Sequence, residues 1–137
     1  MSTITVIDNK HVVMYYHTDT KIVHHIYQPT IDGKHVREQL MRGVELLAQY
    51  GAEKWLSDNH LFNDLPEEDT KWINDVWIGK AVKAGWKYWA VVVPEADMGR
   101  MNMMEFVEVF GNMGVRVLAF TDPDEAMEWL VNIDKES

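Results

Sequence analysis

The chain has 137 residues, the length of one domain, and its 47% hydrophobic and 26% charged residues are the balance of a folded globular protein. A formal charge of −9 repels phosphate polyanions on average, so we expect no nucleic-acid partner. Cysteine is absent, which excludes disulfides and thiolate chemistry. With no signal-peptide pattern and no apolar run near the ~20 residues that cross a bilayer, we expect a cytoplasmic protein without membrane insertion.

The first quarter of the chain predicts three strands, because residues 3–8, 10–18 and 21–28 are rich in β-branched and aromatic side chains. Short turn-forming segments separate them, which is typical of an antiparallel meander. After these strands the spacing of the apolar residues changes to that of a helix, which predicts a helix that ends near Gly51. Its apolar face consists of Val36, Leu40, Val44, Leu47 and Ala48.

The remainder alternates strands with helices. Strands are predicted at 52–57, 87–94 and 115–120, and helices at 65–84, 103–112 and 123–133. Short apolar strands alternating with helices favour parallel pairing. The predicted fold is α/β in one domain, residues 1–137, with a mixed sheet that starts antiparallel and ends parallel.

Acidic and amide residues at three predicted helix starts have the pattern of N-caps: Asp64 before Glu67, Asn102 before Glu105, and Asp122 before Glu125. These side chains occupy the helix N-termini that would otherwise bind phosphate. The sequence also lacks a glycine-rich phosphate loop, so we predict no nucleotide and no other cofactor.

The segment after the strand at 52–57 is the richest in candidate groups, with Ser57, Asp58, Asn59 and His60 in succession. It should lie at the carboxyl end of the parallel strands, where α/β sheets bind ligands. Glu95 and Thr121 follow the next two strands and should lie along the same edge. The alternative is that Ser57, Asp58 and Asn59 only form turn hydrogen bonds with the backbone.

The six histidines predict no metal site. His24 and His25 point to opposite faces of a strand, and His11 and His17 are ~20 Å apart along one. His60 beside Asp58 and Asp64 is the one plausible mixed cluster, and it lacks a recognisable ligand spacing.

Tryptophan and methionine are the other conspicuous residues. One face of the helix at 65–84 is apolar and indicates core packing: Ile73, Val76, Trp77, Ala81 and Ala84. In the helix at 103–112 the face is Met103, Phe106, Val107 and Phe110. Met101 and Met104 fall off that face, so they either contact a partner or apolar ligand or fill gaps in the core. Surplus apolar residues could support a homodimer: Leu46, Leu61 and Phe62.

In element order, and most specifically in the segments "KWLSDN" and "DEAMEWL", the chain resembles small bacterial proteins described as SpoIIAA-like or STAS-like. Their fold is related to the CRAL-TRIO lipid-binding domain. The resemblance implies helices chiefly on one side of the sheet and a non-enzymatic role in binding a regulatory protein partner or a small apolar ligand. STAS anti-sigma-factor antagonists are phosphorylated on a serine near the start of a helix, whereas here Ser57 ends a strand and Asp64 stands near the helix start.

The sequence therefore predicts a binding or regulatory module. Its expected contact surface comprises Ser57, Asp58, Asn59, His60, Glu95, Met101, Met104 and Thr121. The alternative, from a different functional class, is a hydrolase or metal-assisted enzyme that uses Asp58, His60 and Glu95.

Overall fold

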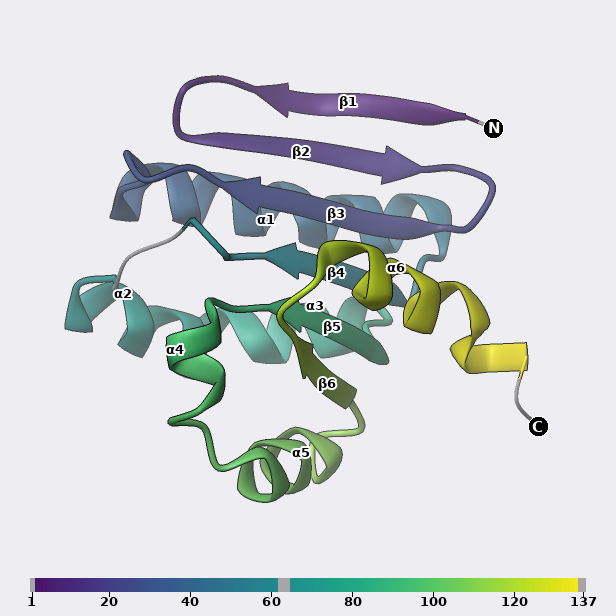
Figure 1. Ribbon diagram of the computed structural model, residues 1–137. Helices are drawn as coiled ribbons and strands as arrows, with labels where there is room; N and C mark the ends of the chain where they lie inside the picture. Colours follow the sequence, from purple (N-terminus) through teal and green to yellow (C-terminus); the bar gives the residue numbers. More distant parts are fainter. Residues whose placement is uncertain (1, 62–64, 136–137) are drawn as a thin grey trace.

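The computed structural model describes residues 2–61 and 65–135, whose strands form one six-stranded sheet (Figure 1). The strands lie across the sheet in chain order. β1 to β3 pair antiparallel and β3 to β6 pair parallel, which confirms the predicted α/β fold with a mixed sheet. The bounds are β1 Thr3–Asp8, β2 Val12–His17, β3 Ile22–Tyr27, β4 Lys54–Asp58, β5 Tyr88–Val92 and β6 Arg116–Phe120.

The helices follow the third and later strands. Their bounds are α1 Gly33–Tyr50, α2 Glu67–Trp72, the π-helical segment η1 Ile73–Trp77, α3 Ile78–Ala84, α4 Glu95–Met98, α5 Met103–Gly111, α6 Pro123–Asn132 and the final 3-10 turn η2 Ile133–Lys135. α2, η1 and α3 follow one another without a break. Among the described helices, none combines the length and apolar character needed to span a bilayer.

Helices cover both faces of the sheet, but unequally. α1 and α3 lie behind the sheet in Figure 1, and α6 lies alone in front of β4 and β5. α5 packs through Phe106 and Phe110 on the same face as α1 and α3. The expectation of helices mainly on one face is confirmed. β4 is buried along its whole length because it has helices on both sides.

Two of the predicted helix caps are confirmed. Asn102 accepts a hydrogen bond from the backbone N–H of Glu105 at 3.1 Å, and Asp122 accepts one from Asp124 at 2.9 Å. Asp64 lies outside the described residues, and the residue directly before α2 is Pro66. The fixed φ of proline suits a helix start. The three acidic residues in the first turn of α2 stabilise the helix, because their negative charges lie at the positive end of the helix dipole.

Several predicted packing positions are wrong, each for a geometric reason. Ala48 is exposed, because the buried stripe of α1 includes Gly43 and Leu46 instead. Leu46 is only 2% exposed and belongs to the core, so it is not surplus apolar surface. Val76 is 39% exposed because the wider turn of η1 shifts the helical period at that point. Val107, which was predicted to pack, also faces solvent. Of the other two residues predicted to be surplus apolar surface, Leu61 is exposed and Phe62 lies outside the described residues.

Candidate ligand-binding site

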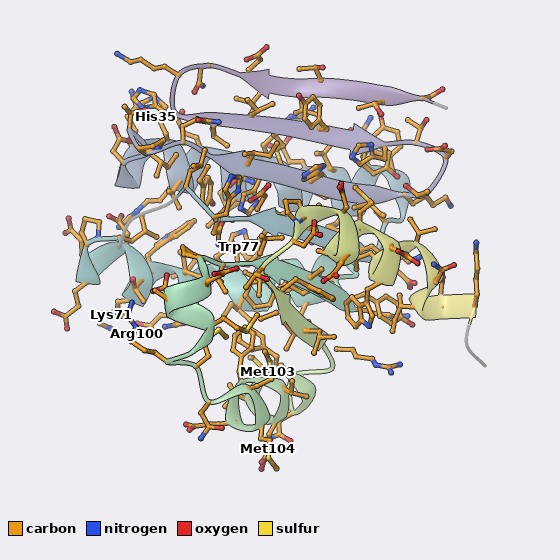
Figure 2. All side chains as sticks on the ribbon, in the orientation of Figure 1. His35, Lys71, Trp77, Arg100, Met103 and Met104 are labelled. Carbon is orange, nitrogen blue, oxygen red and sulfur yellow. The ribbon has the colours of Figure 1, made fainter. Side chains whose placement is uncertain are left out.

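A cavity of about 210 Å³ lies between the sheet and the helices on its more heavily covered face. Its wall is mostly aromatic and is formed by Tyr27, Trp55, Trp77, Trp86, Trp89 and Phe110. These residues come from β3, β4, η1, β5, α5 and the segment before β5. The cavity is thus built where the sheet, α1 and the continuous helix of α2, η1 and α3 meet, and Figure 2 shows Trp77 near the centre of the molecule.

The aromatic wall follows from strand register. Trp55 on β4 pairs with Trp89 on β5, so the two indoles project from the same face of neighbouring parallel strands. Trp77 meets Trp55 edge-on with ring centroids 5.2 Å apart, and Trp86 meets Trp89 in the same way at 5.3 Å. Edge-to-face contacts of this kind are favourable and hold the rings in fixed orientations. The wall is therefore pre-formed.

A chain of polar groups lies within this apolar wall. His25 Nδ1 accepts a hydrogen bond from Trp55 Nε1 at 3.0 Å, so the ring proton resides on Nε2, which donates to Asn59 Oδ1 at 3.1 Å. The contact with Trp55 requires a neutral imidazole, because a protonated Nδ1 could not accept. Burial, partly opposed by the Asn59 hydrogen bond, lowers the pKa of His25 to about 3. The network therefore stays neutral and acts as a hydrogen-bonding site at physiological pH.

Two further residues that line the cavity carry polar groups. The Ser57 hydroxyl oxygen accepts a hydrogen bond from Trp89 Nε1 at 2.9 Å. The indole N–H of Trp86 is buried and has no hydrogen-bond partner among residues 2–61 and 65–135. Buried N–H groups almost always have a partner in folded proteins, because an unpaired one costs ~1–3 kcal/mol. An unpaired donor beside a cavity is a position where a ligand could supply the missing acceptor.

The segment expected to form the site divides between the two faces of the sheet. Ser57 and Asn59 line the cavity, whereas Asp58, alternating with them along β4, points to the opposite face. Asp58 accepts hydrogen bonds from the backbone N–H of His60 at 3.3 Å and from the His60 ring. The backbone contact is the turn chemistry that such sequences usually form. Asn59 continues the strand pairing through its N–H, which donates to the Val92 carbonyl at 2.9 Å.

The other predicted contact residues do not line this cavity. Glu95 lies exposed in the first turn of α4, and Thr121 is exposed after β6. Met101 is half-buried beside β5 and β6 and borders a shallow groove along α5. Met104 is 83% exposed and points away from the sheet in Figure 2.

Sequence reasoning missed His25, Trp55, Trp86 and Trp89 as site residues. Alternation along the strand could have indicated Trp55, because Trp55 and Ser57 are two positions apart and must share a face of the sheet. The position of Trp86 beside them depends on how the helix before β5 returns to the sheet, which periodicity does not report.

Comparisons of the chain with protein-family models, with curated proteins and with solved structures find no match.

Proposed function

We propose that this chain is a cytoplasmic, non-enzymatic binding module of STAS-like type whose ligand is a small, largely apolar molecule. The tryptophan-lined cavity carries the proposal, because it combines a pre-formed apolar wall with the unpaired N–H of Trp86. Ligand sites are typically apolar pockets with a few well-placed polar groups. The expected role of partner regulation rests on the resemblance in element order.

The size of the cavity limits the ligand class. A dry cavity of ~150 Å³ is known to bind benzene, so about 210 Å³ is sufficient for one or two fused rings or a short branched chain. The ligand would place a carbonyl oxygen or ring nitrogen against Trp86 Nε1. A full lipid chain is too large, and a charged ligand would meet no ionised partner, because His25 is neutral.

The test uses two probes of the same shape: naphthalene, which has no hydrogen-bond acceptor, and quinoline, which has one. Binding is followed by tryptophan fluorescence in the wild type, in Trp86→Phe and in Trp129→Phe, a control in which a tryptophan of α6 outside the cavity is changed. We expect quinoline to bind the wild type about fivefold tighter than naphthalene, which corresponds to one hydrogen bond of ~1 kcal/mol. Trp86→Phe should abolish that preference, and Trp129→Phe should retain it.

Saturable binding that Trp86→Phe leaves unchanged for both probes would place the ligand elsewhere. No saturable change in fluorescence with either probe, up to their limits of solubility, would refute the cavity as the binding site. A native mass spectrum of the protein from its natural source is the complementary measurement, since a retained small molecule would identify the ligand directly.

The enzymatic alternative has one observation in its favour. The buried Asp58 carboxylate is hydrogen-bonded to the half-exposed His60 ring, a pairing that can orient an imidazole for general-base catalysis. Glu95, the third residue of that hypothesis, is exposed and forms no hydrogen bond or ion pair with either residue within the described part of the chain. Hydrolysis of activated esters that is lost in His60→Ala would support this function over the first.

A further inference from the structure

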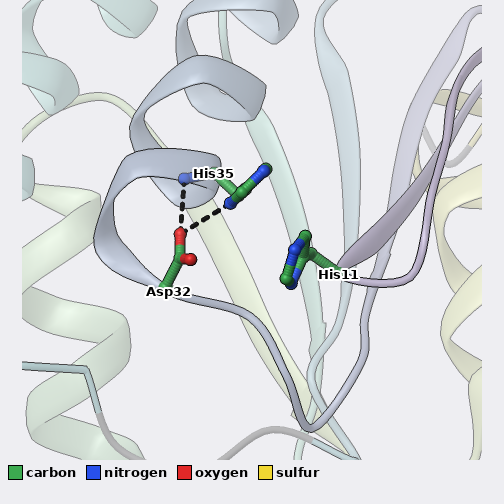
Figure 3. Close-up of side chains that lie close together, drawn as sticks. All are labelled: His11, Asp32 and His35. Carbon is green, nitrogen blue, oxygen red and sulfur yellow. Dashed lines mark hydrogen bonds and ion pairs between the residues drawn. The ribbon is translucent and has the colours of Figure 1, made fainter.

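Three side chains with metal-binding atoms meet at the N-terminal end of α1, beyond the carboxyl end of β3 (Figure 3). His11 belongs to the turn between β1 and β2, Asp32 directly precedes α1, and His35 lies in its first turn. One donor atom from each lies within 4.8 Å of the other two. The sequence prediction compared His11 only with His17 along a strand and therefore did not consider this group.

His11 is oriented as a metal-binding histidine usually is. Its Nδ1 lies 2.9 Å from the backbone carbonyl oxygen of Thr30, which can only accept, so Nδ1 carries the proton in the neutral ring. The lone pair of Nε2 is then available for a metal. In known metal sites a hydrogen bond of this kind from the non-ligating nitrogen fixes the ring and its tautomer.

The backbone around His11 is held by two further contacts with the segment that precedes α1. Gln28 N–H donates to the His11 carbonyl at 2.9 Å, and the Thr30 hydroxyl donates to the Lys10 carbonyl at 2.6 Å. These bonds connect the turn that carries His11 to the segment that leads to Asp32. The backbone positions that carry His11 and Asp32 are therefore fixed relative to each other, although they are distant in the sequence.

Asp32 and His35 already form a close pair. Asp32 Oδ1 accepts the backbone N–H of His35 at 2.9 Å, as an N-cap, and lies 2.7 Å from His35 Nδ1. Two ligands on one tetrahedral zinc ion, each at ~2.0–2.2 Å, are roughly 3.4 Å apart. A zinc ion can therefore replace the proton between this carboxylate and this imidazole with a small outward movement of either side chain.

The His11 ring stacks on the His35 ring with centroids 3.9 Å apart, so the third ligand lies beside the other two and needs only to turn out of the stack for its lone pair to meet the same ion. Two imidazoles and one carboxylate are a donor set that zinc accepts, and catalytic zinc sites commonly have three protein ligands with water in the fourth position. The net charge of −9 also favours cation binding over anion binding.

We propose that His11, Asp32 and His35 bind one zinc ion, with water completing a tetrahedral coordination. The ion would connect the β1–β2 turn to the start of α1. Because zinc would bind the folded chain and not the unfolded one, it should also stabilise the fold. This proposal is independent of the ligand proposed for the tryptophan-lined cavity.

The test is calorimetric titration of the full-length chain with zinc chloride, paired with thermal unfolding in zinc and in excess EDTA. We expect one zinc ion per chain and a rise in Tm that EDTA reverses. His11→Gln and His35→Gln should each weaken binding at least about tenfold. His60→Gln is the matched control, since it removes a half-exposed histidine beside a carboxylate elsewhere on the surface.

A second measurement needs no variant. Zinc added to the wild type should shift the imidazole NMR signals of His11 and His35 and leave those of His17 and His60 unchanged. Zinc binding of full affinity in the doubly substituted His11→Gln, His35→Gln chain would overturn the proposal. A wild type that shows neither heat nor signal shifts with millimolar zinc would overturn it as well.

Discussion

At the scale of single residues, the packing of α1 on the sheet depends on Gly43. A Cβ at this position would lie 2.0 Å from the edge of the Trp55 ring, far inside van der Waals contact. Trp55 is itself fixed by its hydrogen bond to His25 and by its edge contact with Trp77, so it has no free direction in which to move. Glycine is required here by close approach of the helix and not by its φ angle.

We expect Gly43→Ala to lower the free energy of unfolding by ~1–3 kcal/mol, the usual cost of overpacking, although alanine is the better helix former. Gly79→Ala is the control, because a Cβ there meets nothing within 4 Å and Gly79 is exposed on α3. That change should raise stability by ~0.5–1 kcal/mol. Urea denaturation of both variants measures the difference, and equal effects would show that Trp55 moves aside.

At the scale of elements, one charged contact connects α1 to α2. Arg37 Nε donates to Asp69 Oδ1 at 2.8 Å, and the guanidinium lies 5.1 Å from the centre of the Trp72 ring. Asp69 is only 5% exposed, so its carboxylate depends on this partner. The close approach of Gly33 to the same carboxylate shows that the start of α1 is fitted around Asp69.

Removal of this contact by Asp69→Ala should cost ~1–3 kcal/mol, since a hydrogen bond to a charged group that is largely buried is lost. Asp75→Ala removes the partner of Lys71 in an exposed ion pair of the same continuous helix and should cost less than ~0.5 kcal/mol. Thermal unfolding of the two variants provides the comparison. If both variants lost a similar free energy of unfolding, burial of the Asp69 ion pair would add nothing to its contribution to stability.

The elements themselves were largely predictable from the sequence. Strands and long helices follow from hydrophobic period, and β1 coincides with the predicted residues 3–8. The single-turn helix α4 was not predicted, because four residues are too few to show a period. The π-helical segment η1 was missed for a related reason: it changes the period within one helix and moves Val76 to the surface.

The candidate site was only half predictable. Ser57 and Asn59 were found because they end a parallel strand, where ligands commonly bind. Asp58 and His60 were grouped with them, although alternation along β4 sends Asp58 to the other face. The zinc-binding group is formed by residues 11, 32 and 35, whose proximity depends on tertiary contacts between two turns. Spacing along the sequence carries no information about such a site.

At the scale of the whole molecule, two neighbouring histidines make stability depend on pH. Burial, together with the charge of His17, lowers the pKa of His24 to about 4, and burial lowers the pKa of His25 to about 3. Both ordinary values are 6.5. Between pH 6.5 and about 4 the unfolded chain therefore binds protons that the folded chain excludes, so acidification through this range favours unfolding.

We expect the free energy of unfolding to be constant above about pH 7 and to fall below it, by at most ~1.4 kcal/mol per pH unit for each of these histidines. Urea denaturation at pH 7.5, 6.0 and 5.0 measures the slope. His24→Gln should reduce the slope by removing one of the two groups. A stability profile that is flat from pH 7.5 to 5.0 would contradict this prediction.

The strict order of the strands, each one beside its neighbour in the chain, bears on how the protein is made. As the polypeptide leaves the ribosome, every new strand can add to the edge of a sheet that already exists, without waiting for later residues to be inserted between earlier ones. α6, which is synthesised after all six strands, then packs back over β4 and β5, and Asp134 accepts a hydrogen bond from Lys54 at 2.9 Å. Synthesis and assembly can thus run in the same direction, with α6 closing the face of the sheet that stays open until β6 has been added.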